Sequence, residues 1–388
     1  MRTSSAAVAD ALALRAEAIV DLDAIRTSVA TLCRAAGDAA VMAVVKADGY
    51  GHGLVPSAQA ALDAGATWLG VVLVEEATAL RAAGFRGPLL VLLEPPPGAA
   101  EQAVEHDVDV GIGSAEGLQA AAVAGRTAGR PLRVHLKVDT GLSRGGAVAA
   151  DWPGLCALAA AAEAEEAVRV VAVWSHFAHA DDPGHPTTAR QVGAFREALE
   201  VAAAAGLRPE IRHLANSAAT LTLPAAHFDL VRPGIAVYGL SPVPRVAGSA
   251  ALGLLPAMTL RARVALTKRV DVGTGVSYGH RYTTAAETTL ALVPLGYADG
   301  VPRAASNTAE VLVAGRRRTI AGTVCMDQFM VDMGAREVEI GSIVTLLGKD
   351  GDERITAEEL AEQTGTINYE VTTRIPSRVP RIYLGEES

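Results

Sequence analysis

The sequence has few cysteine residues and no long apolar run. Its 388 residues include three cysteines, an odd number at separated positions, which excludes a disulfide framework and a paired-cysteine metal site. Isolated cysteines are typical of proteins from reducing compartments. No apolar run approaches the about 20 residues that span a bilayer. Charged residues at positions 10, 15 and 17 interrupt the N-terminus where a signal peptide would need an apolar core. These absences predict a cytoplasmic protein that is not embedded in a membrane.

Aromatic residues and positive charge are also scarce. Aromatic residues make up 4% of the chain, and the formal net charge is −9. An acidic surface repels polyanions, so neither nucleic acid nor an anionic membrane is expected as a partner. One basic run, Arg316-Arg317-Arg318, is expected to form a solvated hairpin turn rather than a nucleic-acid patch. The composition therefore favours a small-molecule substrate.

Half of the chain is apolar and rich in alanine and valine, which suits small helices packed on β-branched strands. Short apolar runs alternate with alanine-rich helical stretches over residues 22–245, and several of those stretches end in glycine. Eight such repeats predict a parallel (β/α)8 barrel rather than an open sheet. The predicted strands cover residues 40–45, 68–73, 89–93, 108–113, 132–138, 168–175, 211–215 and 228–233.

The remainder, residues 246–388, has a different pattern. Apolar and polar positions alternate between glycines, which predicts a mainly antiparallel β domain. One helix is expected within it, starting after Thr356, because Thr356 and Glu359 have the spacing of a capping box. An early strand at about 12–21 precedes the first barrel repeat and is assigned to this second domain.

A lysine at the end of the first barrel strand is the most informative residue of the chain. Lys46 follows a buried run, and lysine is seldom buried without a partner. Desolvation lowers the pKa of an ammonium group, and the neutral amine is a nucleophile toward aldehydes and a base toward carbon acids. The alternative is a lysine that reaches from the strand end to water.

Other polar residues follow the later strands, where the catalytic groups of such a barrel lie. Phosphate is often bound after strands seven and eight. A lysine amine and a phosphate site together indicate pyridoxal 5′-phosphate as the cofactor. The residues at these strand ends are Tyr50, Lys137, Asp139, Arg144, His176, Asn216, Ser217, Arg232, Gly234 and Ile235.

The chain resembles the alanine racemases, which are barrel-type (fold-type III) pyridoxal-phosphate enzymes. The likeness runs from about Ile19 to Tyr383, and the order of the motifs makes it specific. The matching motifs are VVKADGYGHG, HLKVDTGLSRGG, SHFAHAD, ANSAA, VRPGIAVYG, VSYGHRY, LGYADGVPR, GTVCMDQFMVD and INYEVTTRIPSRVPR.

The resemblance implies roles for the catalytic residues. Lys46 would carry the cofactor and act as one base, and Tyr278 of the partner subunit would act as the second base on the opposite face. Arg232 would face the pyridine nitrogen, and because a guanidinium is not deprotonated it would leave that nitrogen unprotonated. Arg144 would lie beside the second base and bind substrate. Lys137 matches a position that is often carbamylated in the family.

The resemblance also implies the binding residues and the assembly. The phosphate contacts would be Tyr50, Ser217, Gly234, Ile235 and Tyr369, with Asn216 and His176 around the ring. The backbone of Met326 would bind the substrate carboxylate, and Tyr297, Cys325 and Asp327 would line the entrance. The expected protein is a homodimer with shared active sites and no metal. By the same resemblance it would be an isomerase that interconverts L- and D-alanine and supplies D-alanine for peptidoglycan.

Three other functions remain open at this point. A serine or broad-specificity racemase of the same class would have the same catalytic residues and differ in pocket volume. A barrel-type decarboxylase would be expected to place an acidic residue at the pyridine nitrogen, where this chain has Arg232. A non-catalytic pyridoxal-phosphate carrier would lack the C-terminal β domain.

Overall fold

The structure is a computed structural model, and it describes residues 14–96 and 98–385. The chain divides into two compact units, one of residues 24–255 and one that combines residues up to 23 with residues 256–388. The division falls after Leu255 rather than after Arg245, because the segment before Leu255 bonds back to the barrel. Ser28 accepts a hydrogen bond from the Leu255 amide (3.1 Å), and Thr31 donates one to the Gly253 carbonyl (3.1 Å).

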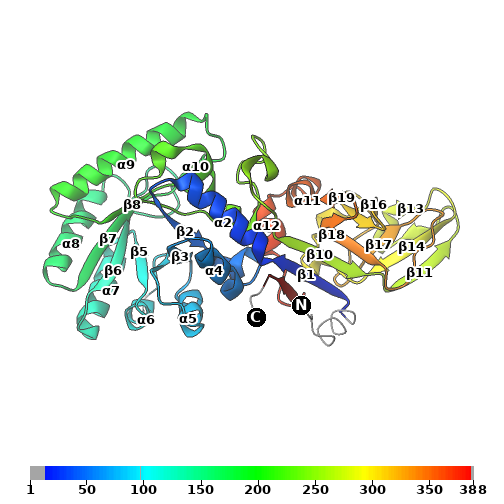
Figure 1. Ribbon diagram of the computed structural model, residues 1–388, viewed down its shortest axis with the longest axis horizontal. Coiled ribbons are helices and arrows are strands. Elements are labelled where there is room, and N and C mark those ends of the chain that lie inside the picture. Colours follow the sequence, from blue (N-terminus) through cyan, green and yellow to red (C-terminus); the bar gives the residue numbers. More distant parts are fainter. Residues whose placement is uncertain (1–13, 97, 386–388) are drawn as a thin grey trace. The chain divides into compact units, whose positions relative to one another are not determined.

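The first unit is a parallel barrel with helices α5 to α9 at the periphery of its strands (Figure 1). Neighbouring strands pair in the order β8-β7-β6-β5-β4-β3-β2-β9, and a bridge between Asn216 and Arg232 joins the two ends. All eight predicted strands are present. They are β2 (Ala40–Val44), β3 (Trp68–Val71), β4 (Leu89–Val91), β5 (Asp109–Ile112), β6 (Leu132–Lys137), β7 (Val168–Trp174), β8 (Ile211–His213) and β9 (Leu230–Val231).

The helices of this unit follow the strands in alternation, as the βα pattern requires. Three short 3-10 helices complete the unit: η1 (Pro224–Ala226), η2 (Ile235–Tyr238) and η3 (Ala250–Leu252). The α-helices are α2 (Leu22–Ala36), α3 (Lys46–Tyr50), α4 (Leu54–Asp63), α5 (Val74–Ala82), α6 (Ala99–Glu105), α7 (Ala115–Ala128), α8 (Trp152–Ala164), α9 (Pro186–Ala204) and α10 (Ser217–Thr222).

An apolar layer fills part of the barrel interior. Met42, Trp68 and Leu90 pack there with Leu230, and all four are buried. The glycines of the interior leave room for large neighbours, since a side chain at Gly70 would collide with the Met42 thioether. Burying each such side chain contributes roughly 1.5–3 kcal/mol. This layer makes the barrel a packed core that positions the strand ends.

The second unit is built on a mainly antiparallel sheet in the order β11-β14-β17-β16-β15-β18-β10-β1-β20, with β19 paired to β18. The early strand β1 lies between β10 and β20; the predicted residues 12 and 13 are outside the described part of the chain. The strands are β1 (Ala16–Asp21), β10 (Met258–Arg263), β11 (Leu266–Val270), β12 (Gly275–Val276), β13 (Tyr282–Thr283), β14 (Thr288–Val293), β15 (Glu310–Val313), β16 (Arg316–Ala321), β17 (Phe329–Asp332), β18 (Ile343–Asp350), β19 (Glu353–Ile355) and β20 (Arg381–Leu384).

The helices of the second unit differ in part from the prediction. Helix α11 (Ala357–Thr364) has the expected capping box, in which Thr356 Oγ1 accepts from the Glu359 amide at 3.1 Å. A second helix, α12 (Asn368–Thr373), was not expected because β-branched residues make up half of it. Three 3-10 helices, η4 (Tyr278–His280), η5 (Tyr297–Asp299) and η6 (Arg303–Ala305), lie between the strands.

The arginine run does not form the predicted turn. The turn consists of Ala314 and Gly315, both with positive φ, and the three arginines begin the return strand β16. Arg317 forms ion pairs with Glu310, Glu353 and Glu359 at 3.0–3.2 Å. Arg317 therefore pairs on the sheet surface with acidic residues that lie seven to 42 positions away in the sequence.

Within the described residues, no helix is both long and apolar enough to cross a bilayer. The same residues contain no group of three or more His, Cys, Asp or Glu side chains placed to hold a metal ion. The three cysteines, Cys33, Cys156 and Cys325, are free thiols.

Candidate active site

Lys46 lies at the start of a left-handed turn. Strand β2 is buried and ends one residue before Val45, and Lys46 follows. Ala47, Asp48 and Gly49 then have φ between 53° and 60° with ψ between 43° and 52°. This conformation costs roughly 1–2 kcal/mol for each non-glycine residue, so the surrounding structure must maintain it. The turn fixes the backbone that presents the Lys46 amine.

Glu76 is one of the groups that hold this turn, and sequence reasoning missed it. Its Oε1 accepts from the Ala47 amide at 2.7 Å, and its Oε2 accepts from the amides of Val72 and Leu73 at 2.9 and 3.2 Å. One carboxylate thus connects the segments after β2 and β3. Asp48 adds a second clamp by accepting from the Leu54 amide at 2.8 Å.

Hydroxyl and amide groups converge where the last two strands end. Ser217 Oγ accepts from the Gly234 amide at 2.7 Å, and both residues are buried. The buried Tyr50 hydroxyl packs so closely on Gly234 that any side chain there would collide with it. Asn216 caps α10 by accepting from the Ala219 amide (3.1 Å), and Ile235 begins η2. The cluster offers hydroxyl and amide donors of the kind that bind phosphate.

Arg232 is buried, with 4% of its surface exposed. Its Nη2 donates to the carbonyls of Ser175 (2.8 Å) and Leu214 (3.2 Å), and its Nη1 donates to His213 Nδ1 (2.9 Å). Its guanidinium also stacks over the Trp174 ring at 4.9 Å. Burial lowers the pKa of Arg232 to about 9, so the group stays charged at neutral pH.

Cations crowd this end of the barrel. Burial and then the charge of Arg144 lower the pKa of Lys46. The same two causes, with Arg232, lower the pKa of Lys137 to about 8, and Lys137 Nζ lies 4.5 Å from the Trp174 ring centroid. Burial and then Arg232 lower the pKa of His176 well below its usual value. Asp139 is a nearby carboxylate, but it accepts from three turn amides at 2.8–3.1 Å. The site therefore favours a neutral amine and an anionic ligand.

Tyr278 lies in the second unit on a strained turn. The preceding residue, Ser277, has φ 62° and ψ −171°, a region that is essentially restricted to glycine. Ser277 Oγ donates to the Thr323 carbonyl (2.6 Å), and Thr323 Oγ1 donates to the Tyr278 carbonyl (2.8 Å). The side chain of Tyr278 is 72% exposed and lines a cavity of about 490 Å³ together with Cys325. The backbone is thus fixed while the phenol is presented outward.

The loop that contains Cys325, Met326 and Asp327 is braced from two sides. The amides of Tyr297 and Ala298 donate to the carbonyls of Cys325 (3.1 Å) and Met326 (2.9 Å). The two segments come so close that a side chain at Gly296 would collide with these carbonyl oxygens. Arg378 pairs with Asp327 (2.5 Å) and with the fully buried Asp299 (2.9 Å). The side chains of Tyr297, Met326 and Asp327 are exposed.

The predicted site residues therefore form two groups. The barrel unit brings together Lys46, Tyr50, Lys137, Arg144, His176, Asn216, Ser217, Arg232, Gly234 and Ile235. The second unit gathers Tyr278 and Cys325 around one turn, with Tyr297, Met326 and Asp327 on the adjoining loop. Tyr369 lies on a different element of that unit, helix α12.

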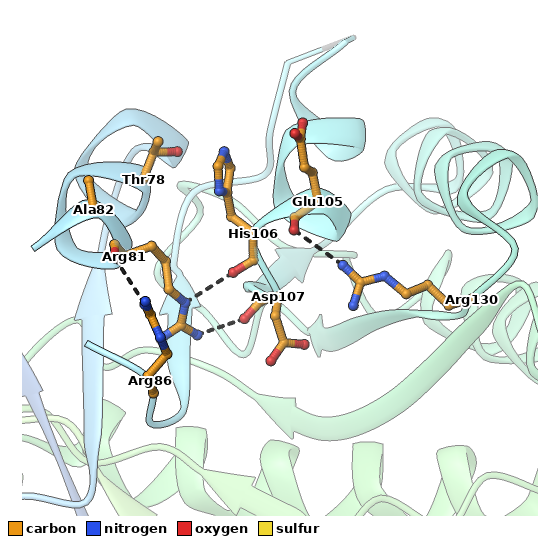
Figure 2. A pocket seen from close by; sticks show the side chains of 8 residues that line it. All are labelled: Thr78, Arg81, Ala82, Arg86, Glu105, His106, Asp107 and Arg130. Carbon is orange, nitrogen blue, oxygen red and sulfur yellow. Dashed lines mark hydrogen bonds between the residues drawn. The ribbon is translucent and has the colours of Figure 1, made fainter. Parts of the chain in front are cut away.

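A second polar cavity, of about 420 Å³, has a structural explanation. It lies where α5, α6 and α7 end, and Figure 2 shows its arginines directed at backbone carbonyls. Arg81 donates to the carbonyls of Phe85, Gly87, His106 and Asp107 at 2.7–3.0 Å. These bonds satisfy carbonyl groups at the amino-terminal face of the barrel, a face associated with stability rather than catalysis.

A parallel barrel with a lysine after its first strand, combined with an antiparallel β unit, is the architecture of barrel-type pyridoxal-phosphate enzymes. Family models for the N-terminal and C-terminal domains of alanine racemase match residues 20–242 and 257–383. The chain belongs to the alanine racemase family, and it is accordingly an isomerase of a pyridoxal-phosphate-dependent class.

Individual relatives agree over nearly the whole length. The chain is 60% identical to an alanine racemase of Frankia casuarinae, with 96% of this chain and 97% of that protein covered. It superposes on the alanine racemase of Streptomyces coelicolor A3(2) with a TM-score of 0.95 at 53% identity, covering 97% of this chain and all of the other. A crystal structure of alanine racemase from D-cycloserine producing Streptomyces lavendulae gives a TM-score of 0.94 at 53% identity, with coverages of 96% and 98%.

Proposed function

We propose that the chain racemises alanine as a homodimer with two bases, Lys46 of one subunit and Tyr278 of the partner subunit. The observation that carries the proposal is the amine of Lys46, which is held on a strained turn where burial and then the charge of Arg144 lower its pKa and favour the neutral form. D-alanine formed in this way would serve bacterial peptidoglycan.

The residues of the barrel fit pyridoxal 5′-phosphate. The donor cluster of Tyr50, Ser217 and the Gly234 backbone suits a phosphate, with Ile235, Asn216 and Tyr369 as further contacts. The amine of Lys46 would hold the aldehyde carbon, and His176 would lie beside the ring. When bound, this cofactor withdraws the electron pair that remains on the α-carbon after its proton leaves.

Racemisation requires proton transfer on both faces of the α-carbon. Lys46 Nζ would exchange the proton on one face, and Tyr278 Oη the proton on the other. Positioned acid and base groups typically contribute about 10²–10⁴-fold to the rate. Tyr278 supports this role because it projects from a fixed turn and is exposed on its own chain, where a partner subunit can reach it.

Arg232 would face the pyridine nitrogen and leave it without a proton. A guanidinium has no acceptor, and all of the bonds of Arg232 to carbonyls require it to donate. The weaker electron withdrawal that follows would limit side reactions at the α-carbon, such as transamination. It also argues against a decarboxylase.

The substrate carboxylate would be bound by Arg144 and the Met326 backbone. Lys137, whose pKa is lowered to about 8, has the partly neutral amine that carbamylation requires, and a carbamate there would orient Arg144. Tyr297, Cys325 and Asp327 would line the entrance. A serine or broad-specificity racemase stays the second candidate, because the residues that perform the proton transfers would be the same.

The test is proton NMR of L-alanine in deuterated water with cofactor-loaded protein, together with a chiral assay of the same sample. We expect loss of the α-proton signal and accumulation of D-alanine. Unchanged L-alanine would contradict the proposal, and the same experiment with L-serine would then identify the alternative substrate.

A further inference from the structure

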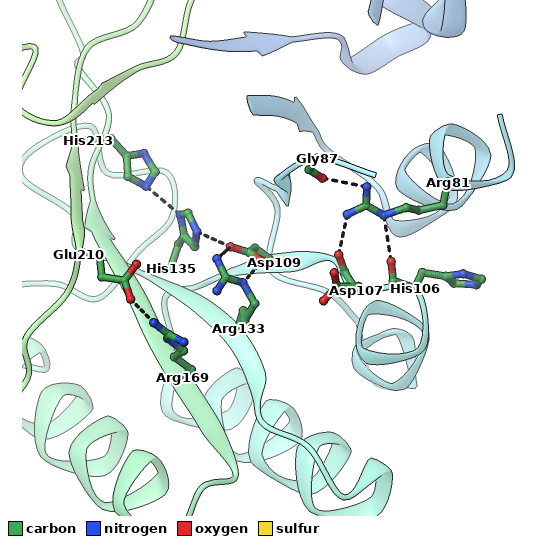
Figure 3. Close-up of polar contacts among 10 residues, drawn as sticks. All are labelled: Arg81, Gly87, His106, Asp107, Asp109, Arg133, His135, Arg169, Glu210 and His213. Carbon is green, nitrogen blue, oxygen red and sulfur yellow. Dashed lines mark hydrogen bonds and ion pairs between the residues drawn. The ribbon is translucent and has the colours of Figure 1, made fainter. Parts of the chain in front are cut away.

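A row of ionisable side chains crosses the barrel interior beneath Arg232. Figure 3 shows His213, His135, Asp109 and Arg133 in sequence along this row. Arg232 Nη1 bonds to His213 Nδ1 (2.9 Å), and His213 Nε2 bonds to His135 Nδ1 (2.9 Å). His135 Nε2 bonds to Asp109 Oδ2 (3.0 Å), and Arg133 pairs with both oxygens of Asp109 at 2.7 and 3.1 Å.

The donor and acceptor inventory fixes the direction of every bond in the row. Arg232 can only donate, so His213 Nδ1 must accept. Burial and then the charge of Arg232 lower the pKa of His213 well below its usual value, so the imidazole is neutral and carries its proton on Nε2. His135 Nδ1 then accepts, and His135 Nε2 donates to Asp109. In each of the three hydrogen bonds between Arg232 and Asp109, the donor therefore lies on the Arg232 side and the acceptor on the Asp109 side.

The row is buried, so losing any one of its hydrogen bonds would destabilise the fold. Asp109, His135 and His213 are all buried, with 0–3% exposed surface. The Trp174 ring stacks on His213 (5.5 Å, 6° between planes), and the Trp68 ring meets His135 edge-on at 5.6 Å. A buried polar group without a partner costs about 1–3 kcal/mol, whereas barrels of this kind fill the same layer with valine, isoleucine or leucine.

Arg232 lies among basic side chains at this end of the barrel. Lys137 on β6, His176 after β7 and His213 on β8 face it, and Arg144 contributes to the positive field. Within the described residues, the hydrogen-bonded row leads from Arg232 to the carboxylate of Asp109. Hydrogen bonds in such a chain polarise one another, so a change at Asp109 can be passed along the two imidazoles to Arg232.

We infer that Asp109 is a positioning residue which, through His135 and His213, holds Arg232 in a single orientation as a hydrogen-bond donor. This inference rests on the proposed function, in which Arg232 faces the pyridine nitrogen. Asp109 is too deep in the barrel to be the group at that nitrogen itself, since two imidazoles separate it from Arg232. Its effect on the reaction is therefore indirect.

The experiment combines histidine-selective ¹⁵N NMR with kinetics of the cofactor-loaded enzyme. In the wild type, His213 and His135 should each have an unprotonated Nδ1 and a protonated Nε2. The variant Asp109→Asn keeps the shape and removes the charge. It should change the ring signals of His213, which does not touch Asp109, and lower kcat roughly tenfold, the equivalent of one pKa unit, while KM for alanine stays within about twofold.

The matched control is Glu210→Gln, which removes an exposed carboxylate that pairs with Arg169 on the neighbouring strand (Figure 3). It should leave both readouts unchanged, and Asp109→Glu should restore part of kcat. If Asp109→Asn does not fold, His135→Gln interrupts the row while it leaves the Asp109–Arg133 pair in place, and it should produce the same changes at His213 and in kcat.

Two results would overturn the inference. One is a proton on Nδ1 of His213 in the wild type. The other is an unchanged His213 spectrum and kcat in a folded Asp109→Asn or His135→Gln variant. Either result can be told apart from failure of the proposed function, because in that case the wild-type enzyme would not racemise alanine.

Discussion

The two units present their candidate site residues in opposite ways. In the barrel, Arg232 is 4% exposed and its hydrogen bonds go to groups of the same unit, whereas Tyr278 in the β unit is 72% exposed. The barrel groups have pKa values shifted by burial and by one another's charge, as Lys46, Lys137 and His176 show. In the β unit, the backbone is fixed and the side chains project outward.

This difference indicates where each half of the chemistry is prepared. The barrel sets the protonation states of its groups before any ligand arrives. The β unit stores backbone strain at Ser277 and leaves the phenol of Tyr278 to be surrounded by something else. In the proposed dimer, that environment is the barrel of the partner subunit. A Lys46 variant should therefore affect cofactor binding, and a Tyr278 variant should affect turnover alone.

The largest expected effect is that of Lys46→Ala. Without the amine, the protein should lose both the visible absorption of bound cofactor and alanine racemisation, the latter by at least about 10³-fold. Absorption spectra and the chiral assay measure these two effects. The control is Lys349→Ala, an exposed lysine on β18, which should change neither. A Lys46→Ala protein that retains the absorption and the activity would contradict the assignment.

Tyr278→Phe should have the next largest effect. We expect the cofactor absorption to remain and turnover to fall by about 10²–10³-fold, because one face of the α-carbon loses its proton-transfer group. Deuterium exchange should slow more with L-alanine than with D-alanine. Tyr282→Phe is the matched control: it removes a hydroxyl that donates to Asp332 at 2.6 Å, and it should cost about 1 kcal/mol of stability without loss of turnover.

A smaller effect concerns the pH dependence of cofactor loading. The neutral amine of Lys46 is the nucleophile, so the loading rate of cofactor-free protein should rise with pH and level off above the pKa of Lys46, which burial and then Arg144 lower from its ordinary value. Arg144→Gln removes a cation that lowers this pKa, so the rise should move to higher pH and loading at pH 8 should slow roughly threefold to tenfold. Arg126→Gln, on the exposed face of α7, is the control. A shift to lower pH in Arg144→Gln would show that this charge relation is wrong.

Much of the barrel could be predicted because its strands are short apolar runs and its helices end at glycines. Parallel strands place their carboxyl ends on one face, so residues as far apart as Lys46 and Arg232 could be assigned to one site. The left-handed turn after Lys46 could not be predicted, because two of its three central residues, Ala47 and Asp48, are not glycine.

The rest of the site depends on register and on distant partners. The sequence shows His135 and Asp109 as ordinary strand residues. Only the pairing of β5 with β6, of β6 with β7 and of β7 with β8 brings them into one row with His213. Glu76 has the sequence position of a helix-capping residue, and it does cap α5. Nothing in the sequence indicates that it also accepts a hydrogen bond from the Ala47 amide. The partners of Arg317 lie seven to 42 residues away, so the arginine run resembled a turn.

The most direct test of the account is a mixture of the Lys46→Ala and Tyr278→Phe proteins, refolded or exchanged so that mixed dimers form. If each site uses Lys46 of one chain and Tyr278 of the partner subunit, one site in every mixed dimer is intact. An equal mixture should then regain about a quarter of wild-type activity, since half of the dimers are mixed. An activity that stays at the level of the two separate variants, although differently tagged chains demonstrably pair, would contradict the shared active site.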